Sequence, residues 1–250
     1  MLLREDADGV LAIGQASHAW ISGQLARAWG NARFPRPEPY EEVCLAAEQH
    51  DVGMAMWDLD PPREPDSGLP YSFLEMPFPT HLDLWRAAPR RLVTQSRYAA
   101  LLVSMHGLRL YSRRNLDELP DEQAAAIRDY LEAQRRFQDE LGAGLDRRVL
   151  ELGSQLVWTW DALSLALCLG WELRACSDVP TVDGAVDIEI TRVGERRIRL
   201  EPWPFEGDGV RVRCEARRLE GRYETDEALR AALSPASWET VEFELLATSA

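Results

Sequence analysis

Hydrophobic residues recur with two different periods along the chain, and the change of period divides it into parts. Between about residues 16 and 172 the spacing is helical, with helices expected from Ser17 to Gly30 and over 121–141 and 145–170. Between 183 and 248, four segments alternate with period two, as strands do. Residues 2–15 show the pattern of a hairpin that turns at residues 7–9.

This pattern predicts a mainly α protein, α+β overall, in three parts. We expect an N-terminal β-hairpin (1–15), a helical domain (16–172) and a C-terminal antiparallel β portion (183–250). The segment from Pro61 to Pro79 shows neither period and is rich in proline. Long irregular segments of this kind often act as lids, so we expect one here.

Charge and composition exclude several classes of protein. The 250 residues carry 28 basic and 42 acidic side chains, a formal net charge of -14, and every basic residue is arginine. Without lysine the chain cannot form a Walker phosphate loop, a pyridoxal-phosphate enzyme or a protein kinase. The acidic excess argues against bulk nucleic acid binding, whereas a local arginine pocket for one small anion stays open.

Several features predict a cytoplasmic protein that does not enter a membrane. The four cysteines form no CxxC pair, so reduced thiols are expected. The N-terminal residues are acidic where a secretory signal would be apolar. The longest apolar stretch, 156–171, contains Asp161 and is short for a membrane span. The composition leaves a homo-oligomer open.

Asp161 is the most informative candidate for a functional residue. It has apolar neighbours on nearly every side of its predicted helix, and no arginine lies within that run. An isolated carboxylate there would destabilise the fold unless a cation compensated it. Each of the four histidines, taken alone, is more typical of a hydrogen-bonded core residue. Together, neutral imidazoles around a metal ion would hold the cation that compensates the negative charge of Asp161.

The order of these residues resembles the HD-domain superfamily of metal-dependent phosphohydrolases. The stretch AAEQHDVGM is similar to that family's apolar helix ending in His-Asp, and WTWDALSLAL to its last helix with the final aspartate. The SxHA start, the HDxGxxxWD segment and the ALLVSxHGxxLY helix look similar to a bacterial family of HD-like proteins of unknown function. The resemblance covers roughly residues 15–172 and implies an HD-like helical bundle.

The resemblance also implies a dinuclear centre of divalent or transition metal ions (Fe, Mn, Zn or Mg). Its implied ligands are His18, His50, Asp51, His81, His106 and Asp161. Asp51 would bridge the two metals and hold the nucleophilic hydroxide, while His81 and His106 would complete the second site. His81 lies in a proline-flanked segment, and an exposed loop histidine is an equal alternative for it.

These expectations converge on a hydrolase for a phosphate ester or similar small anion. Arg109 and Arg113 follow His106 by about one and two helical turns and would bind the anion, or else serve as solvated charges at the helix end. Trp57 would form a wall of the pocket. Two alternatives stay open: a di-iron oxygenase of the inositol-oxygenase type, and a metal- or ligand-binding module without turnover.

Overall fold

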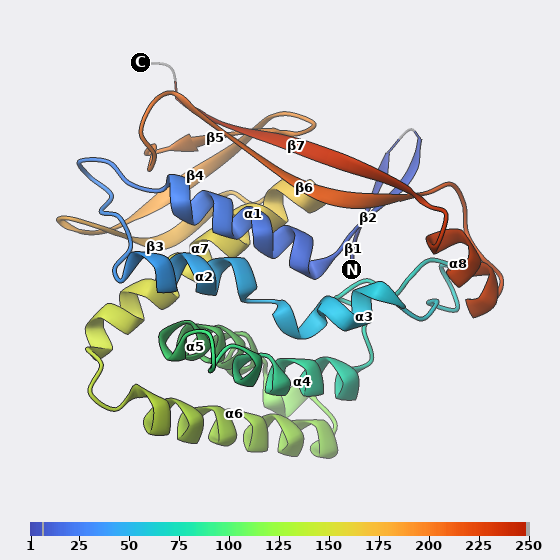
Figure 1. The fold of residues 1–250 in the computed structure, drawn as a ribbon, viewed down its shortest axis with the longest axis horizontal. Coiled ribbons are helices and arrows are strands. Elements are labelled where there is room, and N and C mark those ends of the chain that lie inside the picture. Colours follow the sequence, from blue (N-terminus) through green and yellow to red (C-terminus); the bar gives the residue numbers. More distant parts are fainter. Residues whose placement is uncertain (7, 249–250) are drawn as a thin grey trace.

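A computed structural model describes residues 1–6 and 8–248 and shows an α+β fold in two main layers (Figure 1). It is 48% helical, and a curled, seven-stranded mixed sheet that resembles a half-barrel takes up 24% of the chain. The prediction of a mainly α, HD-like helical bundle is therefore wrong. Local periodicity found most of the elements, but it does not encode how strands from both ends of the chain pair in one sheet.

The sheet joins the two ends of the chain. Its strands, in spatial order, are β1 (Leu2–Asp6), β2 (Gly9–Ile13), β6 (Gly209–Leu219), β7 (Ser237–Ala247), β5 (Arg197–Glu201), β4 (Gly184–Gly194) and β3 (Ala175–Thr181). Neighbours pair antiparallel except β5 and β7, which are parallel. The N-terminal hairpin thus belongs to the C-terminal sheet through β2 and β6. Ala7, in the predicted turn, lies outside the described residues.

Helices cover the concave side of the sheet and extend below it (Figure 1). The α-helices are α1 (Gln15–Ala28), α2 (Tyr40–Gln49), α3 (Ala55–Leu59), α4 (Phe78–Ala87), α5 (Arg97–Ser112), α6 (Asp121–Gly142), α7 (Arg147–Leu169) and α8 (Asp226–Leu233). Short 3₁₀ turns are η1 (Val52–Met54), η2 (Pro89–Arg91) and η3 (Leu116–Glu118). Helix α7 agrees well with the predicted 145–170, because Asp146 caps its first turn and Gly170 ends it in a left-handed conformation.

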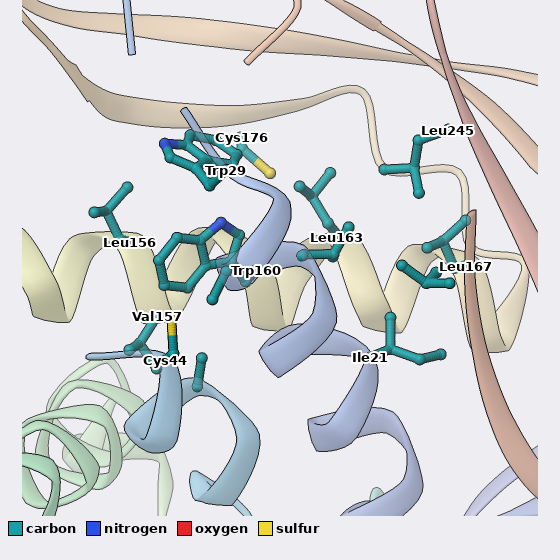
Figure 2. Close-up of a cluster of buried hydrophobic side chains, with 14 of the residues drawn as sticks. Ile21, Trp29, Cys44, Leu156, Val157, Trp160, Leu163, Leu167, Cys176 and Leu245 are labelled. Carbon is teal, nitrogen blue, oxygen red and sulfur yellow. The ribbon is translucent and has the colours of Figure 1, made fainter. Parts of the chain in front are cut away.

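The centre of the core is α7, which lies between the sheet and the other helices. Its side chains meet Ile21 of α1 and Cys44 of α2 on one side and Leu245 of β7 on the other (Figure 2). Trp160 packs edge-on against Trp29, with ring centroids 5.7 Å apart. By length and composition α7 is apolar enough to cross a membrane, but 61% of its most apolar window is buried inside the fold. Its hydrophobicity is that of a core helix.

The proline-rich segment after α3 lies against both ends of the chain. Phe73 donates its backbone N–H to the carbonyl oxygen of Met1 at 2.9 Å, and Tyr223 donates to the carbonyl oxygen of Gly68 at 2.8 Å. A Cβ at Gly68 would lie 2.9 Å from the Tyr223 carbonyl oxygen, so the two backbones approach more closely than a side chain would allow. The segment is therefore a fixed wall in this structure rather than a free loop.

Candidate metal centre

Five of the predicted ligands meet where four helices converge. They are His18 on α1, His50 and Asp51 at the end of α2, His106 on α5 and Asp161 on α7. Four of them are buried, and the Asp161 side chain keeps 14% exposure. Residues separated by more than a hundred positions in the sequence therefore form one polar cluster inside an apolar core.

One ring nitrogen of His50 faces both carboxylates and is free to bind a metal ion. Its Nδ1 donates to the carbonyl oxygen of Ala47 at 2.8 Å. Its Nε2 lies 3.7 Å from Asp51 Oδ2 and 3.3 Å from Asp161 Oδ1, and it has no hydrogen-bond partner among the described residues. Burial alone would lower the pKa of His50, but the two carboxylates outweigh it and raise this pKa to about 9.

His18 is held from both sides of its ring. Ser164 donates its hydroxyl to the Asp161 carbonyl oxygen at 2.8 Å, so its oxygen accepts from Nδ1 of His18, 2.9 Å away. Ser22 adds a second bond to the same serine oxygen at 3.0 Å. Nε2 of His18 then faces Asp51 Oδ2 at 2.6 Å, so that either a proton or a metal ion on this nitrogen would link it to the carboxylate.

His106 completes the cluster from α5. Its Nε2 lies 3.6 Å from Asp161 Oδ2, and its Nδ1 is buried with no partner in residues 1–6 and 8–248. The ring stacks on Trp85 with centroids 5.5 Å apart and planes inclined by 27°. Burial lowers the pKa of His106 to about 4, so the imidazole is neutral near pH 7, the state in which it binds metals.

Two glycines of the HDxG and HG motifs allow this packing. A Cβ at Gly53 would lie 2.5 Å from the backbone oxygen of Leu84 in α4. A Cβ at Gly107 would overlap the Tyr130 hydroxyl and lie 2.9 Å from the ring of Trp85. Glycine at both positions therefore brings α4 and its tryptophan close to the cluster.

The two aspartates are ionised despite their burial. Burial opposes ionisation of Asp51, but His50 and His18 hold the pKa of this carboxyl well below its ordinary value. Burial likewise opposes ionisation of Asp161, and His50 outweighs it, so that pKa is also lowered. Near pH 7 protonated His50 balances one of these two negative charges, and the charge that remains in the interior is suited to a cation.

The donor set fits a metal ion. Ligand atoms within 4.8 Å of one another form two overlapping sets, His18–His50–Asp51 and His50–His106–Asp161. The orphaned Nε2 of His50, which faces both carboxylates, is the sign of a missing partner, because buried polar atoms are nearly always bonded. One imidazole nitrogen binds one ion, so His50 can complete only one of the two sets.

A cleft of about 390 Å³ opens onto this cluster. Its inner end is lined by His18, Asp51, His106 and Asp161. The outer part lies between α4, the end of α5 and the start of α6, and residues 73–78 form one wall. A small molecule can thus reach the cluster without any change of fold.

The comparisons with known proteins identify a family. The sequence profile of the family described as "Protein of unknown function (DUF3891)" matches residues 1–221. The chain belongs to the DUF3891 family. No curated protein and no solved structure matches the chain. The residues matched by the DUF3891 profile include all five of the clustered residues. The description of the family does not mention the HD-domain superfamily, so the resemblance to that superfamily stays a prediction.

His81, the sixth ligand implied by the resemblance, lies beside the cleft but outside both ligand sets of this DUF3891 protein. Trp85 donates its indole N–H to His81 Nε2 at 3.2 Å, so the ring proton is on Nδ1 and is donated to the Tyr111 hydroxyl oxygen at 2.5 Å. Burial lowers the pKa of His81 to about 4. Both ring nitrogens are engaged, and metal binding would require the ring to leave these bonds.

The three predicted substrate residues lie away from the cleft lining. The guanidinium carbons of Arg109 and Arg113 stand 4.4 and 4.6 Å from the ring centroid of Trp158. Arg109 also donates to Gln155 Oε1 at 2.7 Å. Trp57 packs, partly buried, against the apolar cluster that contains the cleft residues Met76 and Trp85, but it does not itself line the cleft. None of the three is among the described residues that line the cleft.

Sequence reasoning missed three polar residues of the cleft, Arg114, Gln15 and Gln123. Arg114 follows the end of α5 and carries a positive charge at the outer end of the cleft. Gln15 is 3% exposed, and its Oε1 has no partner within the described part of the chain. Its spacing of three residues from His18 puts both on one face of α1, which is the signal that was available.

Proposed function

We propose that this DUF3891 protein is a metal-dependent hydrolase of a phosphate ester or a similar small anionic substrate. The observation that carries the proposal is the cluster of three imidazoles and two ionised carboxylates at the inner end of an open cleft. Buried carboxylates of this kind cost stability unless they hold a cation. Clusters of ionisable side chains with shifted pKa values, placed in a cleft, are typical of binding and catalytic sites.

The proposed ligands are His18, His50, Asp51, His106 and Asp161. Mixed imidazole and carboxylate donors suit zinc, manganese or iron better than magnesium, which prefers oxygen. When bound, such ions would supply charge neutralisation for a phosphoryl group and make a coordinated water more acidic. A second ion, as the sequence predicts, would need His81 to exchange its bonds to Tyr111 and Trp85 for the metal.

The residues of the chain orient the substrate for this reaction. Hydrolysis of a phosphate monoester adds water oxygen to phosphorus, breaks the bond from phosphorus to the alcohol oxygen and transfers a water proton to the leaving alkoxide. Asp161 is the carboxylate of the cluster that reaches the cleft surface. The Arg114 guanidinium gives the cleft a positive charge that attracts the anion.

Turnover of 4-nitrophenyl phosphate and bis(4-nitrophenyl) phosphate tests the proposal. The protein is stripped with a chelator and reloaded with Zn²⁺, Mn²⁺ or Fe²⁺. We expect one of these ions to restore hydrolysis, and Asp161→Asn to lower kcat/KM by about 100-fold or more. Ser104→Ala is the control, because this buried serine bonds to Gln134 and Gln138 outside the cluster. Turnover that survives the chelator, or is equal in Asp161→Asn, would contradict the proposal.

The same assay separates hydrolysis from oxygenation. Iron-loaded protein that consumes dioxygen in the presence of a small polar alcohol, without releasing phosphate from any ester, would redirect the assignment to an oxygenase. Metal binding without either reaction would indicate a binding module. We place the protein in the cytoplasm, a proposal supported by four cysteines that are all free and buried.

A further inference from the structure

The wall of the cleft is apolar over most of its length outside the metal cluster. Phe73, Leu74 and Met76 come from the proline-rich segment, while Leu110, Ile127 and Leu165 come from three different helices. Outside the metal cluster, the described polar side chains of this lining are Gln15, His81, Arg114 and Gln123, and His81 already has both nitrogens engaged. A sugar or nucleoside with many hydroxyl groups would find few partners there, and burying them unpaired is costly.

Helix α5 gives the cleft its direction. His106, Leu110 and Arg114 follow one another at intervals of four residues, and all three line the cleft. Such residues lie above one another on one face of a helix. His106 and Leu110 lie one turn apart on α5 and Arg114 follows its end, so the cleft runs along the last turns of α5 from the metal cluster past an apolar wall to an exposed arginine.

A second wall of the cleft is formed by α4, whose lining residues also share one helical face. Phe78, His81 and Trp85 share one face of α4 and also line the cleft. Leu74 lies in the preceding segment and is 67% exposed, although it is a large apolar residue. An exposed leucine beside an open apolar cleft is suited to contact a ligand rather than the core.

We propose, on the basis of the hydrolase function above, that the substrate is a phosphate monoester of an extended, largely apolar alcohol. Its phosphate would lie at the His and Asp cluster and its alkyl or aryl body along the walls formed by α4, α5 and residues 73–78. Arg114, at the outer end, attracts the anion as it approaches. The cleft of about 390 Å³ is large enough for a body of several carbon atoms.

Calorimetric binding of methyl-, butyl- and octylphosphonate, with and without the restoring metal, tests this inference. These probes carry the same headgroup and are not hydrolysed. We expect affinity to rise with chain length, by about three- to fourfold for each methylene group that enters the cleft. We also expect the headgroup contribution to fall when the metal is removed.

The dependence of affinity on chain length tests the apolar substrate, and its dependence on metal tests the hydrolase function. Affinity that rises with chain length in metal-free and metal-loaded protein alike supports the apolar substrate and contradicts the metal-dependent function. Affinity that depends on metal but not on chain length overturns the apolar substrate and leaves the hydrolase standing. Affinity that depends on neither overturns both.

A matched pair of variants excludes general surface binding. Leu74→Ser removes an apolar wall residue, and because its side chain is exposed the fold should tolerate the change. Leu59→Ser is the control, at 64% exposure on α3 and outside the cleft lining. We expect octylphosphonate to bind Leu74→Ser about tenfold more weakly, with methylphosphonate unchanged. An equal loss in both variants would overturn the assignment to this cleft.

Discussion

His50 donates from Nδ1 to the backbone carbonyl oxygen of Ala47, 2.8 Å away, at the end of the same helix. This bond fixes the ring orientation and leaves Nε2 as the nitrogen that faces Asp51 and Asp161. Since Nε2 is the shared member of both ligand sets, His50→Ala should lower metal affinity by about 100-fold or more. Competition with a chromogenic chelator measures the affinity; an unchanged value would remove His50 from the centre.

Ser164 orients His18, so its loss should weaken the metal site without removing a ligand. Ser164→Ala deletes the oxygen that accepts from His18 Nδ1, and we expect metal affinity to fall by about tenfold. Ser104→Ala is the matched control, because both serines are fully buried but Ser104 bonds to Gln134 and Gln138. Equal affinities of the two variants would show that the Ser164 bond has no role in metal binding.

Gly107 keeps Trp85 against His106. In Gly107→Ala the added methyl group would overlap the Tyr130 hydroxyl and the Trp85 ring, so we expect a loss of about 1–3 kcal/mol in the free energy of unfolding. A Cβ at Gly142, in the last turn of α6, would have no atom of the described residues within 4 Å beyond its own helical neighbours. Gly142→Ala should therefore change stability little or raise it slightly. Urea denaturation of both variants checks the difference, and equal midpoints would contradict it.

Arg218 should make the fold sensitive to acid. It binds both oxygens of Asp6, at 2.7 and 3.1 Å, and also pairs with Glu239, joining β1, β6 and β7. The hydrogen bonds to Arg218 lower the pKa values of Asp6 and Glu239 in the folded state. Their contribution is therefore present above the unfolded pKa values, about 4, and is lost as the pH falls through the lowered ones.

Arg218→Met should remove this part of the acid dependence. The variant should be less stable than the wild type at pH 7, and the difference should shrink as the pH falls below about 4. Thermal denaturation between pH 3 and pH 7 measures it. A difference that stays constant over this range would show that Asp6 and Glu239 are not stabilised by Arg218.

The helices could be predicted because their signals are local. The apolar stripe and the end signals at Asp146 and Gly170 place α7 to within a few residues. Helix α5 begins at Arg97, because Ser96 caps it by accepting the Ala99 N–H, and this cap is also a local signal. The sheet could not be predicted in this way. Pairing of β2 with β6 and parallel pairing of β5 with β7 are long-range, and no local period encodes them.

The grouping of the histidines with Asp161 could be predicted from electrostatics, but the residues that line the cleft beside them could not. The carboxylate of Asp161 in an apolar helix indicated a cation, and that argument grouped the four histidines, of which the structure brings His18, His50 and His106 but not His81 into the cluster. The arginine that lines the cleft was missed because the spacing from His106 favours Arg109 and Arg113, whereas Arg114 follows the end of α5. Stacking on Trp158 turns Arg109 and Arg113 aside, and it is Arg114 that lines the cleft. Only the tertiary packing decides which of the three arginines lines the cleft.

The metal content of the purified protein tests the central claim most directly. Elemental analysis of protein prepared without added metal is compared with Asp51→Ala, with folding of the variant confirmed by circular dichroism. We predict at least one transition metal ion per wild-type chain, a second only after incubation with excess metal, and loss of the first ion in the variant. A wild-type protein without metal that also fails to take it up on incubation, or equal metal content in a folded Asp51→Ala, would contradict the account.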